Sequence, residues 1–396
     1  MIGVSIGALS LAIWIYLLSF RGMFWSVRVE PAPAMPDIQI RVTAVIPARD
    51  EAAGIGRAIA SLAGQEIPGE LDIIVVDDHS GDGTADCARA AAAANGAEHR
   101  LTVLPGAALP DGWTGKLWAM AQGIDHARQH RPDYLLLTDA DIEHGPGAVA
   151  ALIARAETGD LDLASLMVKL RCQSWAERWL IPAFVFFFFM LYPPRRVARP
   201  GHPMAAAAGG CMLIRPAALD RIGGIGTIRG ALIDDCALGQ AVKRSGGRIW
   251  MGVTDSTISI REYPSWRDIW AMIARTAYTQ LGYSPLLLVG TLIGLGITYM
   301  APPLLLATGD DLAATLGFAA WLAMALAFAP ILRLYGRPGP TGLLLPLIAL
   351  FYAAATIGSA VNYWRGRGGV WKGRPQAIRK PPTTAPHASK DPGTSA

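Results

Sequence analysis

The sequence of 396 residues is poor in cysteine and carries little net charge. Its four cysteines are scattered and form no Cys-x-x-Cys pair, which argues against a structural zinc site and fits a reducing cytosolic compartment. The formal net charge is only +4, and no basic stripe with interleaved aromatic residues is present. A nucleic-acid-binding domain would need such a stripe on a folded face, so nucleic acid is excluded as a partner.

A complete dinucleotide-binding fingerprint is also missing. Gly54-Ile55-Gly56 lacks the third glycine of G-x-G-x-x-G, and it follows the acids Asp50 and Glu51 rather than a bare strand. An NAD-dependent dehydrogenase is therefore disfavoured as an interpretation of this chain.

Long apolar segments are what the chain has in excess, with 52% hydrophobic residues. Residues 2–20 are about long enough to cross a bilayer, and no small-x-small cleavage site is evident, so residues 1–21 are predicted to be an uncleaved anchor. Arg21 and Arg28 follow it and place the next residues in the cytoplasm.

Three further apolar segments, residues 284–307, 312–334 and 341–363, predict a C-terminal membrane domain over residues 284–364. Residues 365–396 form a basic tail, predicted to be partly disordered. Three crossings would place this tail outside, against the usual charge bias. Either the first segment, interrupted by Pro302-Pro303, does not cross fully, or the tail is an exception.

Between the anchor and these segments, residues 40–280 alternate between strands and helices. Near-continuous apolar runs predict strands at residues 42–46, 71–76, 101–104 and 134–138, and helical spacing lies between them at 51–63, 84–94 and 117–130. Further strands at 209–214 and 248–253 flank a helix at 233–245. The pattern predicts an α/β domain with a Rossmann-like, mostly parallel sheet covered by helices on both faces.

A phenylalanine-rich segment at residues 175–192 is too short to span a membrane comfortably. Crossing there would also separate the two halves of the predicted domain. We interpret the segment as an interfacial helix, with nearby arginines as headgroup contacts. The alternative is a buried core helix of the same length.

Polar clusters follow three of the predicted strands, at residues 47–51, 77–80 and 139–141. Ligands of such sheets bind outside the carboxyl ends of the strands, so the topology brings these clusters together. Asp139 and Asp141 can project to one side of an extended chain, where a cation would relieve their repulsion. Mg²⁺ typically takes one or two carboxylates plus substrate phosphates. The alternative is a strand end whose two acids face water.

Five motifs in order resemble those of family 2 glycosyltransferases of GT-A fold, over residues 41–280. They are Pro-Ala-Arg-Asp-Glu at 47–51, Asp-Asp-His-Ser-Gly-Asp-Gly-Thr at 77–84, Gly-Lys at 115–116, Thr-Asp-Ala-Asp at 138–141 and Asp-Asp-x-x-Leu-Gly at 234–239. The Trp-Thr-Gly-Lys-Leu-Trp-Ala run at 113–119, the phenylalanine block and the C-terminal spans further resemble hopene-associated glycosyltransferases of hopanoid-producing bacteria, and related carotenoid-linked enzymes.

The resemblance implies a nucleotide-sugar donor, with a UDP-sugar as the first expectation, and a bound Mg²⁺ or Mn²⁺. It makes Asp141 the direct metal ligand and places Asp139 beside it, nearer the ribose. Further donor contacts are expected from Pro47, Arg49, Glu51, Asp78, Lys116 and Arg275. Several have structural alternatives: Asp78 could cap the next helix, Glu51 could oppose a helix dipole, and Lys116 could simply be solvated.

The resemblance also makes Asp235 the catalytic base, with Gly210 and Asp234 on the acceptor side. One base acting directly implies single displacement with inversion at the anomeric carbon. The alternative role of the Asp234-Asp235 pair is to cap a helix. This chain has Asp-Asp where the family usually has Glu-Asp, which shortens the first acid and leaves the base in place. Around Arg275 the family's Gln-x-x-Arg-Trp motif is degenerate, which argues against a processive polysaccharide synthase.

The sequence therefore predicts metal-dependent, inverting sugar transfer to a lipid acceptor, hopanoid-related in the narrower resemblance. The protein is expected in the bacterial inner membrane, with several crossings and a cytoplasmic catalytic domain. A polyprenyl-phosphate or polysaccharide glycosyltransferase is the alternative with the same chemistry. A non-enzymatic membrane scaffold is disfavoured, because Asp78, Asp139, Asp141 and Asp235 are all present.

Overall fold

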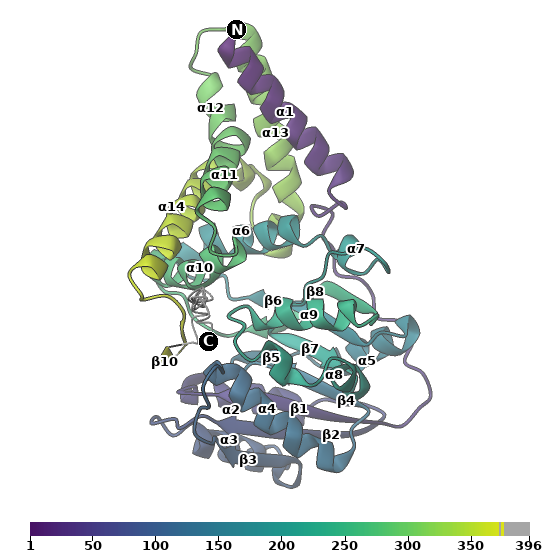
Figure 1. The fold of residues 1–396 in the computed structure, drawn as a ribbon. Helices are drawn as coiled ribbons and strands as arrows, with labels where there is room; N and C mark the ends of the chain where they lie inside the picture. The colour runs from purple at the N-terminus through teal and green to yellow at the C-terminus, as the bar shows by residue number, and fades with distance from the viewer. Residues whose placement is uncertain (372–373, 376–396) are drawn as a thin grey trace, which may run out of the picture.

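In the computed structural model, which describes residues 1–371 and 374–375, a sheet domain stands below a group of long helices (Figure 1). The main sheet has eight strands in the order β3-β2-β1-β4-β7-β6-β8-β5. In chain order these are β1 (Ile40–Ala48), β2 (Gly69–Asp77), β3 (Leu101–Pro105), β4 (Tyr134–Thr138), β5 (Ile142–His144), β6 (Leu163–Leu170), β7 (Cys211–Ile214) and β8 (Ile249–Ser259).

The first four strands are parallel, as predicted, while β7 runs antiparallel between β4 and β6, and β5 antiparallel to β8. The predicted α/β fold with a mostly parallel sheet is confirmed. Strands β5 and β6 were not predicted, and β8 extends to Ser259, six residues past its predicted end. The extension matters because it carries the chain to the carboxylates at the end of β4.

Alternate residues of each strand feed two separate hydrophobic cores. Ile73 and Val75 of β2 face one core, with helices α2 (Ala52–Ala63), α3 (Thr84–Ala94) and α5 (Ala148–Gly159). Ile74 and Val76 face the other, with α4 (Gly115–Ala127) and α9 (Asp234–Arg244). This second core continues without a break into the long helices, so the sheet domain and the apolar part of the protein share one packed interior.

The helical part consists of segments from both ends and the middle of the chain. They are α1 (Ile2–Phe20), α6 (Trp175–Leu191), α7 (Pro194–Val197), α10 (Trp266–Gln280), α11 (Pro285–Leu295), α12 (Ala301–Leu305), α13 (Asp311–Leu334) and α14 (Leu345–Trp364). A short α8 (Pro216–Arg221) lies with the sheet domain, and β9 (Val370–Trp371) pairs with β10 (Arg374–Pro375). Most of the predicted disordered tail lies outside the described residues.

Five helical segments among the described residues are long and apolar enough to cross a membrane, judged by length and composition alone. They are Ile2–Phe20, Trp175–Val197, Pro285–Leu305, Asp311–Leu334 and Gly339–Trp364. Figure 1 shows α6, within the second of these segments, lying crosswise where the long helices meet the sheet domain. Half of that segment is buried inside the protein. The interfacial placement of α6 stays a prediction.

Both ends of α6 are tied to their surroundings by hydrogen bonds. At its start, Ser174 and Glu177 form a capping box, and Glu177 Oε1 also accepts from the Tyr263 backbone N–H at 2.7 Å. At its end, Arg21 donates to the carbonyls of Met190 and Leu191, both at 3.1 Å. These contacts satisfy orphan backbone groups of the helix and fix α6 between the anchor helix and the loop that follows β8.

Candidate active site

A cavity of about 440 Å³ opens at the carboxyl end of β4 and extends into the helical part. Its polar end is lined by Lys116, Asp139, Asp141, Asp234, Asp235, Arg261 and Arg275. The remaining lining is largely apolar and comes mainly from α6 and α10, with further residues from β6, α11, α14 and the segments before β7 and α9. Seven of the predicted site residues therefore meet in one cavity: Asp235, Asp139, Asp141, Lys116, Arg275, Asp234 and Gly210.

Lys116, at the start of α4, joins two acids from distant parts of the chain. Its Nζ lies 2.8 Å from Asp139 Oδ1 and 3.2 Å from Asp234 Oδ2. Burial disfavours the charged form of Lys116, but the two carboxylates more than offset this, so its pKa is raised and it stays cationic. The interpretation of Lys116 as an ordinary solvated lysine is therefore wrong.

Asp139 is partly buried beside two other acids. Burial raises the pKa of its carboxyl, the charges of Asp141 and Asp234 raise it further, and Lys116 lowers it. A group of acids held this close requires compensating positive charge, which Lys116 supplies in part.

Asp141 is held by residues from the unpredicted end of β8. Ser259 Oγ donates to Asp141 Oδ2 at 3.1 Å, and Arg261 follows two residues later. Burial lowers the pKa of Arg261, but Asp141 and Glu51 raise it by a larger amount. Sequence reasoning missed both residues because the predicted strand ended too early. The local signal was weak, because most of the residues between the predicted strand end and Arg261 are polar.

Asp235, on the first turn of α9, is fixed by two backbone N–H groups. Gly209 donates to its Oδ2 at 2.8 Å and Cys236 to its Oδ1 at 2.7 Å. A Cβ at Gly209 would lie only 3.1 Å from that carboxylate oxygen, so glycine is needed for this close approach. Burial and the neighbouring charge of Asp234 raise the pKa of Asp235 to about 6, while Lys116 and the two N–H groups lower it.

A buried polar chain behind the site supports the turn that holds Asp235. Thr138 Oγ1 donates to the Gly210 carbonyl at 2.8 Å and lies 3.1 Å from His144 Nε2. Because the hydroxyl has one proton, His144 Nε2–H is the donor to Thr138. Burial lowers the pKa of His144 to about 4, so the ring stays neutral. Thr138 belongs to the predicted Thr-Asp-Ala-Asp motif, whereas His144 was not singled out from the sequence, where a lone histidine in a strand carries no signal.

Four predicted donor-binding residues lie at the neighbouring strand ends, beside this cavity rather than in its lining. Asp78 is 2% exposed, and Arg49 donates to its carbonyl at 2.5 Å and lies 3.6 Å from its Oδ2. Glu51 Oε1 lies 3.5 Å from Arg261, which connects this edge to Asp141. Pro47 is buried in β1, opposite Val76 of β2.

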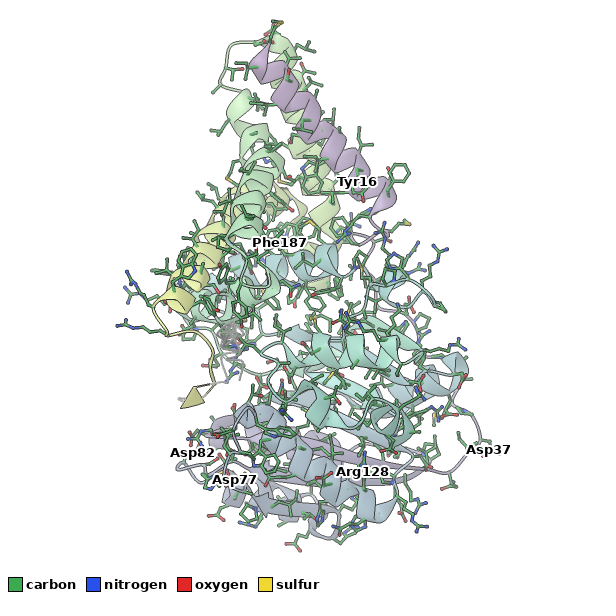
Figure 2. All side chains as sticks on the ribbon, in the orientation of Figure 1. Tyr16, Asp37, Asp77, Asp82, Arg128 and Phe187 are labelled. Atoms are coloured by element: carbon green, nitrogen blue, oxygen red, sulfur yellow. The ribbon has the colours of Figure 1, made fainter. Side chains whose placement is uncertain are left out.

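The loop after β2 caps α2. The backbone N–H groups of residues 50–52 donate in turn to Ser80 Oγ, Thr84 Oγ1 and Asp82 Oδ2, each at 2.9 Å. Figure 2 shows Asp82 at this outer edge of the sheet domain. At the next helix along the chain, α3, Asp82 Oδ1 accepts from the Thr84 backbone N–H at 3.1 Å, while Asp78 is engaged with Arg49.

No group of three or more His, Cys, Asp or Glu side chains within the described residues is arranged to hold a metal by itself. Asp139 and Asp141 supply two carboxylates on one cavity wall. Two carboxylates match the donor set with which Mg²⁺ is held when substrate phosphates complete the coordination.

Comparison with known proteins gives matches of three kinds. Residues 43–223 match the family model described as Glycosyl transferase family 2. A 4,4'-diaponeurosporenoate glycosyltransferase from Staphylococcus aureus strain USA300 is 37% identical over 102 residues, 26% of this chain and 24% of that protein. The protein of the same name from strain MRSA252 is 38% identical over 114 residues, 28% of this chain and 27% of that protein. The matched part spans about a quarter of the length of these relatives.

The third kind of match is a solved structure of similar fold. Mannosyltransferase PcManGT from Pyrobaculum calidifontis, in complex with GDP-Man and Mn²⁺, aligns with a TM-score of 0.57. The alignment covers 92% of this chain and 99% of that one at 18% sequence identity. At that identity the likeness concerns the fold alone.

Proposed function

Because residues 43–223 match the family 2 glycosyltransferase model, we propose that the chain transfers a sugar from a nucleotide-sugar donor to a hydroxyl group of a membrane lipid. The observation that carries the proposal is one cavity of about 440 Å³, in which partly buried acids meet a largely apolar lining. A polar donor and a lipid acceptor would need these two environments side by side. The carotenoid-type name of the S. aureus relatives supports an apolar acceptor.

The donor side lies over β1, β2 and β4. We assign the nucleoside to the edge formed by Arg49, Glu51 and Asp78, with Pro47 shaping its floor. Lys116 and Arg261 lie next to the acids at the polar end, where their charges would stabilise a departing diphosphate. Arg275 is exposed on α10 at the same cavity and is the third cation available to the diphosphate. A UDP-sugar is the donor to test first.

Asp141 and Asp139 are the residues that would hold Mg²⁺ or Mn²⁺. Asp141 is better placed for direct ligation, because Asp139 Oδ1 is already engaged by Lys116 at 2.8 Å. The cation would neutralise charge on the diphosphate as it leaves. Ser259, which donates to Asp141 Oδ2, would orient the ligand from behind.

Asp235 is the general base in this proposal. The acceptor oxygen forms a bond to the anomeric carbon while the bond from that carbon to the diphosphate oxygen breaks, and the diphosphate leaves with the electron pair. The hydroxyl proton passes to a carboxylate oxygen of Asp235, whose orientation is fixed by Gly209 and Cys236. One direct displacement inverts the configuration at the anomeric carbon.

A hopanoid is the more specific hypothesis for the acceptor. A polyprenyl phosphate is the alternative acceptor, and its identification would replace the hopanoid hypothesis.

The test is to incubate the protein in membranes with a panel of radiolabelled nucleotide sugars and total bacterial lipid, and then to extract the lipid. We expect label in the lipid fraction from one sugar, dependent on Mg²⁺ or Mn²⁺. Chromatography of the product separates a neutral glycolipid from an anionic polyprenyl-phosphate sugar. Label that enters only a water-soluble polymer would refute the lipid-acceptor proposal.

We also propose a bacterial inner-membrane location with the catalytic domain in the cytoplasm and three full crossings, by α1, by α11–α12 and by α13. The ends of these helices that are distant from the sheet domain lie close together: a Cβ at Gly3 would lie 3.3 Å from Ala313 and 3.7 Å from Leu305. The near end of α13 lies against the sheet domain, where Tyr335 Oη accepts from the Leu170 backbone at 3.3 Å. Asp310 and Asp311 then lie outside, as the charge bias requires.

The fourth apolar segment, Gly339–Trp364, would enter and leave on the cytoplasmic side. After α13 the chain reverses direction and runs back along that helix, because Trp321 Nε1 on α13 donates to the Leu343 carbonyl at 2.9 Å. At a rise of 1.5 Å per residue, Trp321 lies only about 20 Å above the end of α13. This distance is less than the ~30 Å thickness of the hydrocarbon core of a bilayer. α14 then descends onto α10, where Ser359 Oγ accepts from Tyr278 N at 3.0 Å. The basic tail would stay inside. The sequence-based alternative that kept it inside had residues 284–307, and not this fourth segment, fail to cross.

A labelling experiment tests this topology. Arg367→Cys, just after α14, and Thr308→Cys, in the loop before α13, both replace exposed residues. In right-side-out vesicles we expect a membrane-impermeant maleimide to label Thr308→Cys and not Arg367→Cys, with the reverse in inverted vesicles. The unchanged chain measures the background from its four native cysteines. Labelling of both positions from the same side would contradict the re-entrant arrangement.

A further inference from the structure

The phenylalanine block of α6 divides into two faces with different tasks. Phe184, Phe187, Phe188 and Leu191 line the cavity, and their spacing of i, i+3, i+4 and i+7 places them on one stripe of the helix. Phe186, on the other face, is fully buried against Phe24 and Phe328. The cavity-lining stripe is therefore a distinct surface and not simply part of the core.

The cavity is closed by aromatic rings on the side that faces the long helices. The ring centroid of Phe187 lies 4.9 Å from that of Tyr352 and 5.7 Å from that of Tyr299. Phe187 and Tyr352 line the cavity, whereas Tyr299 lies behind Phe187, is 1% exposed and packs on Trp14 of α1. Figure 2 labels Phe187 in the helical part, above the sheet domain. Solid packing therefore begins directly behind the Phe187 ring.

Hydrogen bonds hold this closure in place. Tyr352 Oη donates to the Leu180 carbonyl of α6 at 2.8 Å, across the cavity edge. Tyr299 Oη lies 3.3 Å from Met190 Sδ, one turn after Phe187 on α6. Because both tyrosines are anchored to α6, the rings cannot move aside without breaking buried polar contacts, each of which would leave an unpaired group.

We infer that Phe187 and Tyr352 form an aromatic wall that sets the size of the acceptor's apolar body, and so make this site selective for acceptor length. The inference rests on the proposed lipid-acceptor function. Asp235 fixes where the reacting hydroxyl must lie, and the wall fixes how far an apolar group can extend toward the long helices. A cavity of about 440 Å³ that serves both substrates leaves room for a limited apolar group near the hydroxyl.

The test compares two neighbouring truncations, Phe187→Ala and Phe186→Ala, with linear primary alcohols of increasing length as acceptors and radiolabelled donor. For the unchanged protein, kcat/KM should rise roughly fourfold per added methylene and then fall once the chain meets the wall. Phe187→Ala should move the optimum to longer alcohols by several carbons. Phe186→Ala opens the core rather than the cavity; because its ring also lies 5.8 Å from that of Phe187, it should move the optimum far less than Phe187→Ala does. Leu replaces Ala at both positions if either variant fails to fold.

The outcomes separate this inference from the function on which it rests. If the unchanged protein transfers sugar to alcohols and both variants keep its length optimum, the wall assignment is wrong and the lipid-acceptor function stands. If the unchanged protein hydrolyses the donor but transfers to none of the alcohols, the lipid-acceptor function fails, and the wall with it. A shift of equal size in both variants would also overturn the wall, because it would trace the effect to general loosening.

Discussion

Asp235→Asn is expected to lower the rate of sugar transfer by at least about a hundredfold while nucleotide-sugar binding changes little. The amide cannot accept the acceptor's proton, whereas the proposed donor contacts come from other residues, at the ends of β1, β2 and β4, on α4 and α10, and after β8. The measurement is kcat with saturating donor and lipid, beside the donor Kd from calorimetry. Asp234→Asn is the matched control: it removes the adjacent acid that pairs with Lys116 and leaves the base in place, so its loss should be smaller.

The pH profile gives this prediction a second readout. Asp235 must be unprotonated to act as a base, and its pKa is raised to about 6 by burial and by Asp234. Transfer should therefore be constant above that pH and fall about tenfold per pH unit below it. In Asp234→Asn one of the charges that raise the pKa is gone, so the inflection should move to lower pH. Full activity of Asp235→Asn, or an inflection that moves upward in Asp234→Asn, would contradict the base assignment.

Asp141→Ala is expected to abolish the metal dependence of nucleotide binding and to reduce transfer at least about a hundredfold, since a cation contributes several kcal/mol to stabilising the transition state. In the unchanged protein, Mn²⁺ should tighten binding of the nucleoside diphosphate and a chelator should weaken it. In the variant, binding should be weak under both conditions. Calorimetric titration with and without Mn²⁺ measures this without any need for turnover.

Two control variants sharpen the metal assignment. Ser259→Ala removes only the hydrogen bond to Asp141 Oδ2, so the metal response should weaken and not disappear. Glu143→Gln removes an acid that pairs with Arg57 in a partly exposed bridge, and the response should stay intact. An undiminished Mn²⁺ response in Asp141→Ala, with loss in an Asp139→Asn variant, would transfer the direct ligand role to Asp139.

Much of the catalytic half could be predicted because its signals are local. A parallel strand that is buried on both faces must be almost wholly apolar, so polar residues that end such a run indicate a sheet edge. That rule located the ends of β1, β2 and β4. It also predicted, from the sequence alone, that Asp78, Asp139 and Asp141 lie at one edge of the sheet. The same rule failed for β8, whose last residues, such as Asp255 and Ser256, are exposed and polar, and with it Ser259 and Arg261 were missed.

The half with the long apolar helices shows the opposite limit, because the sequence of a uniformly apolar segment is the same whatever it packs against. Nothing in the phenylalanine run distinguishes Phe186, buried against Phe328, from Phe187 on the cavity. Likewise, residues 341–363 have the composition of a full crossing, and only the contact between Trp321 and Leu343 supports a re-entrant path.

The sequence by itself determined the α/β fold, the strand ends that carry the acids, the order of the motifs and the presence of long apolar helices, since each depends on neighbours along the chain. Only the tertiary structure decided which residues share the cavity. Lys116, Asp139 and Asp234 meet through contacts between α4, β4 and α9, and the aromatic wall needs α6 and α14 together. Such contacts depend on how elements pack, and hydrophobic packing has no direction that a local pattern could record.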